Sequence, residues 1–400
     1  MLILTILLAL PVALLLLLCA VLWLECSAAL VASRKPRSLP PTPPRLAVLV
    51  PAHNEAGGIQ HTLEQLILQV EQPQQVVVIA DNCSDATAEV ARGVGVTVLE
   101  RFNERDRGKG FALDYGLKYL AADPPEIVVM VDADCDLTPG TIDHIAHQSA
   151  RTGCPVQSLY LMEKPLQPQA KDAVSAFAFK VKNLVRPLGL QQWGQPCLLT
   201  GTGMAFPWDV VRSVDLASGE IVEDMKLGLD LAIAGYAPQF CGDGLVLGRL
   251  PSVEAAATSQ RTRWEHGHLQ MLQRYVPPLL GSAVRQFRLD LLATALELAI
   301  PPLSLLVVLW VGVALVTVLV TLLGWVYIWP FVGIASAGGL LLISILGAWV
   351  KFGREDLPLQ TLLSIPLYIL WKIPLYFKFL RKPEAEWVRT ERDGVESEKS

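Results

Sequence analysis

One long apolar block lies at the start of the chain and another in its last third, and short apolar and polar segments alternate between them. Residues 2–24 are almost wholly apolar and could cross a hydrocarbon core of roughly 30 Å as a helix. Basic residues follow this block, beginning at Arg34, whereas a cleaved signal peptide carries its charges in front. We therefore expect residues 1–33 to form a retained membrane anchor, with the domain that follows in the cytoplasm.

The second apolar block covers residues 291–350. It is divided by the sequence GWVYIWP at residues 324–330, whose aromatic rings are typical of the membrane–water interface. The pattern predicts two transmembrane helices, at roughly 300–322 and 331–350. A chain with the anchor and these two helices crosses the membrane three times.

The flanking segments are more polar. Residues 34–45 are rich in proline and predict a stiff linker. Residues 351–382 are partly apolar but contain prolines and lysines, so we expect an interfacial or re-entrant helix. Residues 383–400 form a charged tail, predicted to be cytoplasmic.

The central region, residues 46–258, alternates between two patterns. Short continuous apolar runs, such as LAVLVPA, QVVVIAD and EIVVMVD, are followed by segments with helical spacing. This pattern predicts an α/β domain with a mostly parallel sheet, covered by helices on both faces. The runs end in the polar sequences HNE, DNCSD and DADCD. Because ligands bind at the carboxyl ends of parallel strands, we expect one shared site at this edge.

Composition supports a membrane protein with a large aqueous domain. Of the 400 residues, 52% are hydrophobic and 18% are charged. A net charge of -5 excludes a globally basic nucleic-acid-binding protein, and we expect no nucleic-acid partner. The seven cysteines contain no C-x-x-C pair, which argues against a structural zinc site.

The three aspartates of DADCD suggest a cation site. Asp132 and Asp134 are two residues apart and leave the predicted strand on the same side. Carboxylate oxygens suit Mg²⁺ or Mn²⁺, which commonly bind substrate phosphates as well. We expect Asp136 to cap the next helix instead. Lys109, in RGKG, lies at a predicted helix N-terminus that could hold an anion or be an exposed turn.

Five motifs in order carry a family resemblance: PAHNE, ADNCSD, DADCD, VED and QRTRW. Together they resemble the membrane-integrated family 2 glycosyltransferases, which include the cellulose, hyaluronan, chitin and poly-N-acetylglucosamine synthases. The resemblance covers about residues 46–270 and implies a GT-A fold. It also implies that residues 259–290 are interfacial helices that carry the Q-x-x-R-W motif.

The resemblance implies a role for each motif residue. Asp224 would be the general base, with Glu223 the competing carboxylate, and Asp132 and Asp134 would meet the metal and diphosphate. The residues implied to bind the nucleotide sugar are Pro51, Glu55, Asp81, Lys109, Asp132 and Asp134. Those implied to bind the acceptor or diphosphate are Gly201, Thr202, Gly203, Glu223, Gln260, Arg263 and Trp264.

The chemistry is compatible with these roles. An inverting displacement needs a carboxylate to take a proton from the acceptor hydroxyl. Arg263 offers a planar fork for the leaving diphosphate, and Trp264 a flat face for a sugar ring. We expect a metal-dependent enzyme of the inner (plasma) membrane that uses a nucleotide sugar, by resemblance a UDP-sugar. Alternatives are a nucleotidyltransferase or a silent subunit of a polysaccharide export complex.

Two acceptors are compatible with the sequence, a growing polysaccharide and a lipid-linked saccharide. WVRTER, at residues 387–392, loosely resembles the gating-loop motif F-x-V-T-x-K of processive synthases but differs at three positions. Export partners and a homo-oligomer are both compatible with the sequence.

For four ionisable residues near apolar segments we expect structural rather than functional roles. We expect His266 and His268 to lie on an interfacial helix rather than bind a metal. Glu25 and Glu297 could mark a polar path for a sugar, but we favour side chains that only reach the membrane interface.

Overall fold

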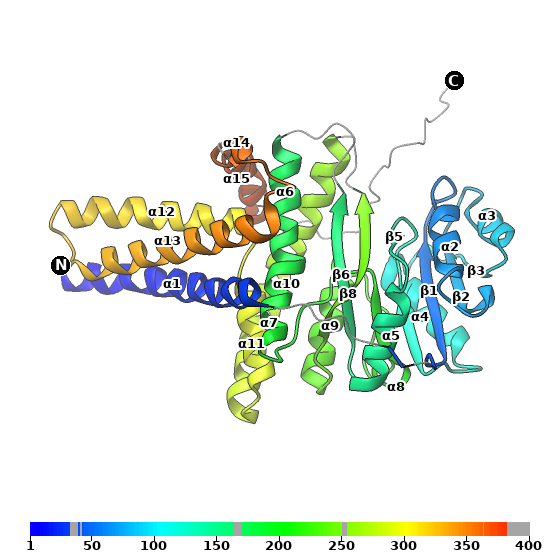
Figure 1. Cartoon of the computed structure of the whole chain (residues 1–400). Helices are drawn as coiled ribbons and strands as arrows, with labels where there is room; N and C mark the ends of the chain where they lie inside the picture. Colours follow the sequence, from blue (N-terminus) through cyan, green and yellow to red (C-terminus); the bar gives the residue numbers. More distant parts are fainter. Residues whose placement is uncertain (33–38, 41, 164–169, 250–253, 363, 382–400) are drawn as a thin grey trace, which may run out of the picture.

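The computed structural model describes residues 1–32, 39–40, 42–163, 170–249, 254–362 and 364–381. Three long helices form a bundle that projects from an α/β domain, with the N-terminus at its far tip (Figure 1). They are α1 (Leu2–Val31), α12 (Leu303–Leu322) and α13 (Trp329–Ala348), which continues as a π-helical turn (Trp349–Gly353). Among the described residues these are the helices long and apolar enough to cross a membrane, as predicted.

Small residues let the bundle helices approach closely. At Gly333 of α13 an added Cβ would lie 2.7 Å from the Val12 side chain of α1. At Gly338 it would lie 2.3 Å from the ring of Trp310 on α12, and the indole of Trp310 donates a hydrogen bond to the Ile334 carbonyl. In lipid, the hydrophobic effect does not drive helices together, so their association depends on such close packing contacts.

The α/β domain is built on an eight-stranded sheet with the order β3-β2-β1-β4-β7-β6-β8-β5. The strands are β1 (Leu46–Ala52), β2 (Val76–Asp81), β3 (Thr97–Arg101), β4 (Ile127–Met130), β5 (Asp136–Leu137), β6 (Val156–Glu163), β7 (Met204–Pro207) and β8 (Gln239–Arg249). Among the described residues, four strand pairings are parallel and three, those of β4 with β7, β6 with β7 and β5 with β8, are antiparallel. The sheet is therefore mixed, with its parallel half formed by the strands that carry the polar sequences.

Helices cover both faces of the sheet. One face is covered by α2 (Ile59–Ile67), α3 (Thr87–Val94) and α5 (Thr141–Thr152), the other by α4 (Lys109–Leu120), α8 (Trp208–Val211) and α9 (Glu223–Ala234). Along β1, Val48 and Val50 pack into the first of these cores, whereas Leu49 packs into the second. Because successive side chains point to opposite faces, a strand buried on both sides must be continuously apolar.

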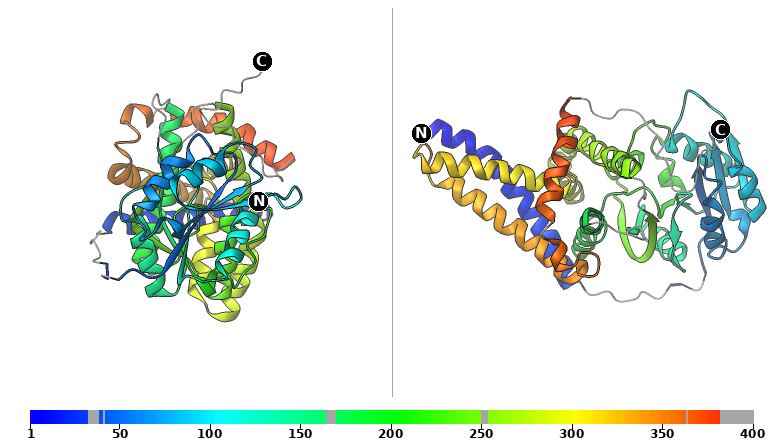
Figure 2. Two further views of the ribbon diagram at one scale, coloured as in Figure 1. Left: turned by 90° about the vertical axis from the view of Figure 1, so that its right-hand side faces the viewer. Right: turned by 90° about the horizontal axis from the view of Figure 1, so that it is seen from above.

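The remaining helices join the domain to the bundle. They are α6 (Ala170–Lys180), a π-helical turn (Val181–Val185), α7 (Arg186–Gln192), α10 (Glu254–Gln286), α11 (Leu289–Ala299), α14 (Leu359–Leu362) and α15 (Ile365–Arg381). Helix α10 runs crosswise between the bundle and the sheet (Figure 1). Figure 2 shows α15 lying across the domain end of the bundle, an arrangement that favours an interfacial helix over a fourth crossing.

Two predicted boundaries need correction. Residues 259–290 form most of one helix, α10, and then the start of α11, rather than separate interfacial helices. The block 291–350 was expected to consist of the two transmembrane helices, but its first residues lie in α11, which packs against α9 and α10 through buried side chains such as Leu291 and Leu298. Pro301 and Pro302 end this packing, and the long apolar helix begins at Leu303.

Asp136 does not cap a helix, contrary to expectation. It lies in β5, where its carboxylate contacts Arg249 at 2.9 Å and His61 at 3.2 Å. The following helix begins at Thr141, after Gly140 in a left-handed conformation. Half of the linker predicted at 34–45 and the whole tail 383–400, with WVRTER, lie outside the described residues.

Candidate active site

A cavity of about 760 Å³ lies at the carboxyl edge of the parallel strands. Its domain end is lined by Pro51 and Asp81, and its opposite end by Leu22 of α1 and Leu303 of α12. One continuous space therefore connects the strand ends with two helices of the apolar bundle.

The cavity collects most of the predicted site residues. Twelve of them line it: Pro51, Glu55, Asp81, Lys109, Asp132, Asp134, Gly201, Glu223, Asp224, Gln260, Arg263 and Trp264. Thr202 and Gly203 do not. Thr202 is fully buried, and its hydroxyl accepts a hydrogen bond from the Asp132 backbone N–H at 3.1 Å. Gly203 has a φ of 63° and packs so tightly against Ser158 that a side chain would not fit. These two residues shape the loop behind the cavity wall.

Hydrogen bonds join the polar ends of β1 and β2. The His53 Nδ1 lies 2.7 Å from the Asp81 carbonyl oxygen, and the Asn54 side chain accepts a hydrogen bond from the Ser84 N–H at 2.7 Å. Asn54 adopts a φ of 56°, a conformation that asparagine tolerates better than most residues. The Asp81 carboxylate is buried and contacts the Arg101 guanidinium at 2.6 Å. Arg101 thus fixes Asp81 beside the cavity.

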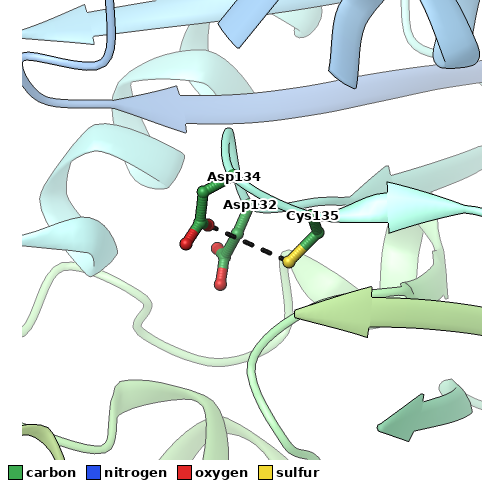
Figure 3. A group of neighbouring side chains, drawn as sticks. All are labelled: Asp132, Asp134 and Cys135. Carbon is green, nitrogen blue, oxygen red and sulfur yellow. Dashed lines mark hydrogen bonds between the residues drawn. The ribbon is translucent and has the colours of Figure 1, made fainter. Parts of the chain in front are cut away.

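Asp132 and Asp134 point into the same space, with Cys135 beside them (Figure 3). Among the described residues, these three form the one group of at least three His, Cys, Asp or Glu side chains able to share a metal ion. The two carboxylates suit Mg²⁺ or Mn²⁺. The thiol does not, because sulfur is a soft ligand that suits other metals, and burial raises the pKa of Cys135 well above its usual range.

Lys109 connects three parts of the site. Its ammonium lies 2.5 Å from the Asp132 carboxylate and 3.7 Å from that of Glu223, and it donates a hydrogen bond to the Gly201 carbonyl at 2.6 Å. Burial alone would lower the pKa of Lys109, but the carboxylates of Asp132 and Glu223 raise it above its usual value. Lys109 therefore stays charged and is not an exposed turn residue.

Glu223 and Asp224 open helix α9 at the cavity wall. Gly201 faces them with a φ of 101°, and a Cβ there would lie 3.2 Å from Asp224 Oδ2. Burial raises the pKa of Asp224, although Lys109 opposes the rise. Burial also raises the pKa of Glu223 to about 7, against the opposing charge of Lys109. The charge of Lys109 thus acts on both neighbouring carboxyls, whose charged forms are disfavoured by burial.

The raised pKa of Glu223 predicts a pH-dependent stability. Between its ordinary value of 4.5 and about 7, the folded protein keeps a proton that the unfolded chain releases. Stability should therefore fall as the pH rises through this window, by on the order of 3 kcal/mol. Glu223→Gln lacks this titration. The Tm of the variant minus that of the wild type, measured in detergent, should therefore increase between pH 5 and pH 8. A constant Tm difference across this range would contradict the assignment.

The Q-x-x-R-W residues lie on α10 beside the cavity. The ring of Trp264 packs 5.8 Å from that of Phe179 on α6, which leaves it at the wall. His266 and His268 are buried, and their Nε2 atoms lie 3.2 Å and 3.1 Å from the carbonyl oxygens of Leu375 and Leu298. These contacts pack α10 against α15 and α11.

The interpretation of Glu25 and Glu297 as interfacial side chains was wrong. Both are buried against Arg186, whose guanidinium lies 2.8 Å from Glu25 and 2.6 Å from Glu297. Helices α1 and α7 approach so closely here that a Cβ at Gly189 would lie 1.9 Å from the Glu25 carbonyl oxygen. No motif marks Arg186, but an acidic residue inside an apolar helix is itself a signal for a buried partner.

A model of the family described as glycosyltransferase like family 2 matches residues 43–267. The chain belongs to this family. The match covers the eight strands of the described residues and the Q-x-x-R-W motif, so membership of glycosyltransferase family 2, the broader part of the expectation, is confirmed.

A solved structure shows the same fold over nearly the whole chain. A mannosyltransferase from Pyrobaculum calidifontis, determined in complex with GDP-Man and Mn²⁺, is 18% identical and superposes with a TM-score of 0.54. The alignment covers 94% of this chain and 99% of that chain. The GT-A fold class is thereby confirmed, with three apolar helices in addition to the mixed sheet.

Two curated relatives match shorter stretches. An uncharacterized protein of Methanocaldococcus jannaschii is 35% identical over 98 residues, which are 24% of this chain and 39% of the relative. The 4,4'-diaponeurosporenoate glycosyltransferase of Staphylococcus aureus is 35% identical over 92 residues, which are 22% of this chain and 24% of the relative. The chain thus matches less than half the length of either relative.

Proposed function

We propose that the transferase moves a sugar from a nucleotide sugar to an acceptor held at the membrane, with inversion at the anomeric carbon. The observation that carries the proposal is the single cavity between the carboxylates and the apolar bundle. A water-soluble donor can enter at the strand ends, where Asp81 and Asp132 lie. An acceptor with an apolar anchor can enter at the end lined by Leu22 and Leu303.

In this proposal Asp224 is the general base. As the acceptor oxygen bonds to the anomeric carbon, its proton passes to the Asp224 carboxylate, and the nucleoside diphosphate leaves on the opposite side with the bonding electrons. Arg263 and Lys109 lie at the same cavity and can bind the diphosphate oxygens. Trp264 can stack on the acceptor sugar.

Asp132 and Asp134 would hold Mg²⁺ or Mn²⁺. A divalent ion at this site would neutralise charge that develops on the leaving diphosphate. The solved mannosyltransferase was determined with Mn²⁺, which supports a divalent cation here without deciding between the two metals.

Asp134→Ala should abolish Mn²⁺-dependent donor binding while the protein stays folded, because it removes half of the carboxylate pair. Calorimetry with Mn²⁺ and nucleoside diphosphate, supported by an unchanged Tm, would measure the loss. Asp136→Ala is the matched control, since that carboxylate is two residues further along, in β5, and binds Arg249 instead. Unchanged Mn²⁺ and nucleotide affinity in Asp134→Ala would remove it from the metal site.

A donor screen tests the proposed function itself. The resemblance suggests UDP-sugars, whereas the solved mannosyltransferase was determined with GDP-Man, so both nucleotide series belong in the screen. With detergent-purified protein and a membrane lipid extract, one donor should be consumed with release of its nucleoside diphosphate. The labelled product should be either a long polymer or a lipid-extractable saccharide. Release of pyrophosphate would indicate nucleotidyl transfer, and consumption of no donor would contradict the proposal.

We further propose that the α/β domain lies on the cytoplasmic side of an inner (plasma) membrane. Basic residues follow the anchor, and α15 lies across the end of the bundle rather than along it (Figure 2). A reporter fused after Ser400 should then read cytoplasmic. An external signal would show a different number of crossings.

A further inference from the structure

Lys182 lies in the wall of the cavity on the π-helical turn between α6 and α7. This turn packs beside α1, and the neighbouring Asn183 is fixed by a hydrogen bond to the Tyr160 carbonyl at 3.2 Å. Such a turn places an extra residue in the helix and is often found at functional sites. Within the described part of the chain, no hydrogen bond or ion pair holds the Lys182 ammonium.

Four other cations that line the cavity have acidic partners. Arg186 contacts Glu25 and Glu297, Lys372 contacts Glu265, Arg261 contacts Asp172, and Lys109 contacts Asp132. Lys182 has only longer-range neighbours, of which Asp224, Glu297 and Glu265 are negative and Arg186 is positive. Glu297 and Glu265 are already paired, so the charge of Lys182 is left for Asp224 and for whatever enters the cavity.

The surroundings of Lys182 define the ligand that would suit it. Burial lowers the pKa of Lys182, and Asp224 opposes this change, so the ammonium lacks the solvation that water or a close counter-ion would supply. On the bundle side, the cavity is lined by Leu22, Ile300 and Leu303. A neutral polysaccharide would gain nothing from the cation. A molecule with an anionic group and a hydrocarbon chain matches both features.

We propose that Lys182 binds the phosphate of a lipid-linked acceptor whose hydrocarbon chain passes Leu22 and Leu303. The inference rests on the proposed sugar transfer, and it selects the lipid-linked saccharide over the polysaccharide as acceptor. The phosphate would be held at the bundle side of Asp224, so that the hydroxyl of the attached sugar can point toward that carboxylate.

Direct binding of farnesyl phosphate tests the inference without any nucleotide sugar. In detergent, the wild type should bind farnesyl phosphate well above farnesol and above inorganic phosphate. Lys182→Gln should weaken farnesyl phosphate binding about tenfold or more, the usual cost of one charge-assisted hydrogen bond. Lys182→Arg, which keeps the charge, should retain most of it. Lys118→Gln is the control, because Lys118 is exposed on α4 and paired with Asp114.

Each other outcome overturns the inference. Equal affinity for farnesol would show that the phosphate is not recognised, and equal affinity for inorganic phosphate would show an anion site with no lipid component. Normal farnesyl phosphate binding by a folded Lys182→Gln would mean that the lysine only keeps Asp224 ionised. A donor screen without any turnover would contradict the proposed function. The binding assay contains no nucleotide sugar, so it tests the lipid phosphate site independently of that result.

Discussion

Asp224→Asn is expected to lower the rate of sugar transfer by about two to four orders of magnitude, the usual contribution of a positioned general base. The amide keeps the shape of the side chain but cannot accept a proton at neutral pH. Its surroundings should change little, because the amide has nearly the same size and Gly201 presents no side chain to Asp224 Oδ2. Affinity for the donor and for Mn²⁺ should therefore stay close to that of the wild type.

Glu223→Gln is the matched control for this prediction. Adjacent residues on a helix point about 100° apart, so Glu223 and Asp224 cannot both face the same acceptor hydroxyl. Glu223 lies 3.7 Å from Lys109, which is consistent with a role in charge balance. Transfer should fall much less in Glu223→Gln than in Asp224→Asn. A larger loss of transfer in Glu223→Gln would indicate that Glu223 is the base. Weak donor binding in Asp224→Asn would indicate a structural role for Asp224.

The parallel half of the sheet could be predicted because its strands are buried on both faces. Runs such as that around Val48 and Leu49 have to be apolar throughout, and their polar ends must then meet at one edge. The antiparallel partners were not predictable in this way. Strand β7 has only four residues and pairs with both β4 and β6, which depends on contacts distant in the sequence rather than on a local pattern.

The candidate site likewise contains residues that could be predicted from the sequence and residues that could not. Motif residues such as Asp132 and Trp264 line one cavity, because the chemistry fixes both residue type and order. Thr202 and Gly203 were predicted to belong to the same site but lie behind the wall, and sequence alone does not tell a wall residue from a supporting one. Lys182 and Arg186 lie in no motif, so their importance depends on which helices pack around them.

Arg186→Met is expected to destabilise the folded protein by about 3–5 kcal/mol, the usual cost of removing one partner from a buried ion pair. The substitution leaves the carboxylates of Glu25 and Glu297 buried without their cation. These three residues also connect α1, α7 and α11, so their loss should loosen the junction between the anchor and the domain. Thermal unfolding in detergent would measure the effect as a lower Tm.

Two further variants decide whether charge or packing is responsible. The triple variant Arg186→Met, Glu25→Gln, Glu297→Gln removes the uncompensated charges, and it should recover much of the lost stability because a neutral replacement of a buried ion cluster is often tolerated. Arg45→Met breaks an exposed pair with Asp123 and should change stability by less than about 1 kcal/mol. If the triple variant were as unstable as Arg186→Met, the guanidinium would act through its packing between the helices. An unchanged Tm in Arg186→Met would mean that the buried cluster does not hold the anchor to the domain.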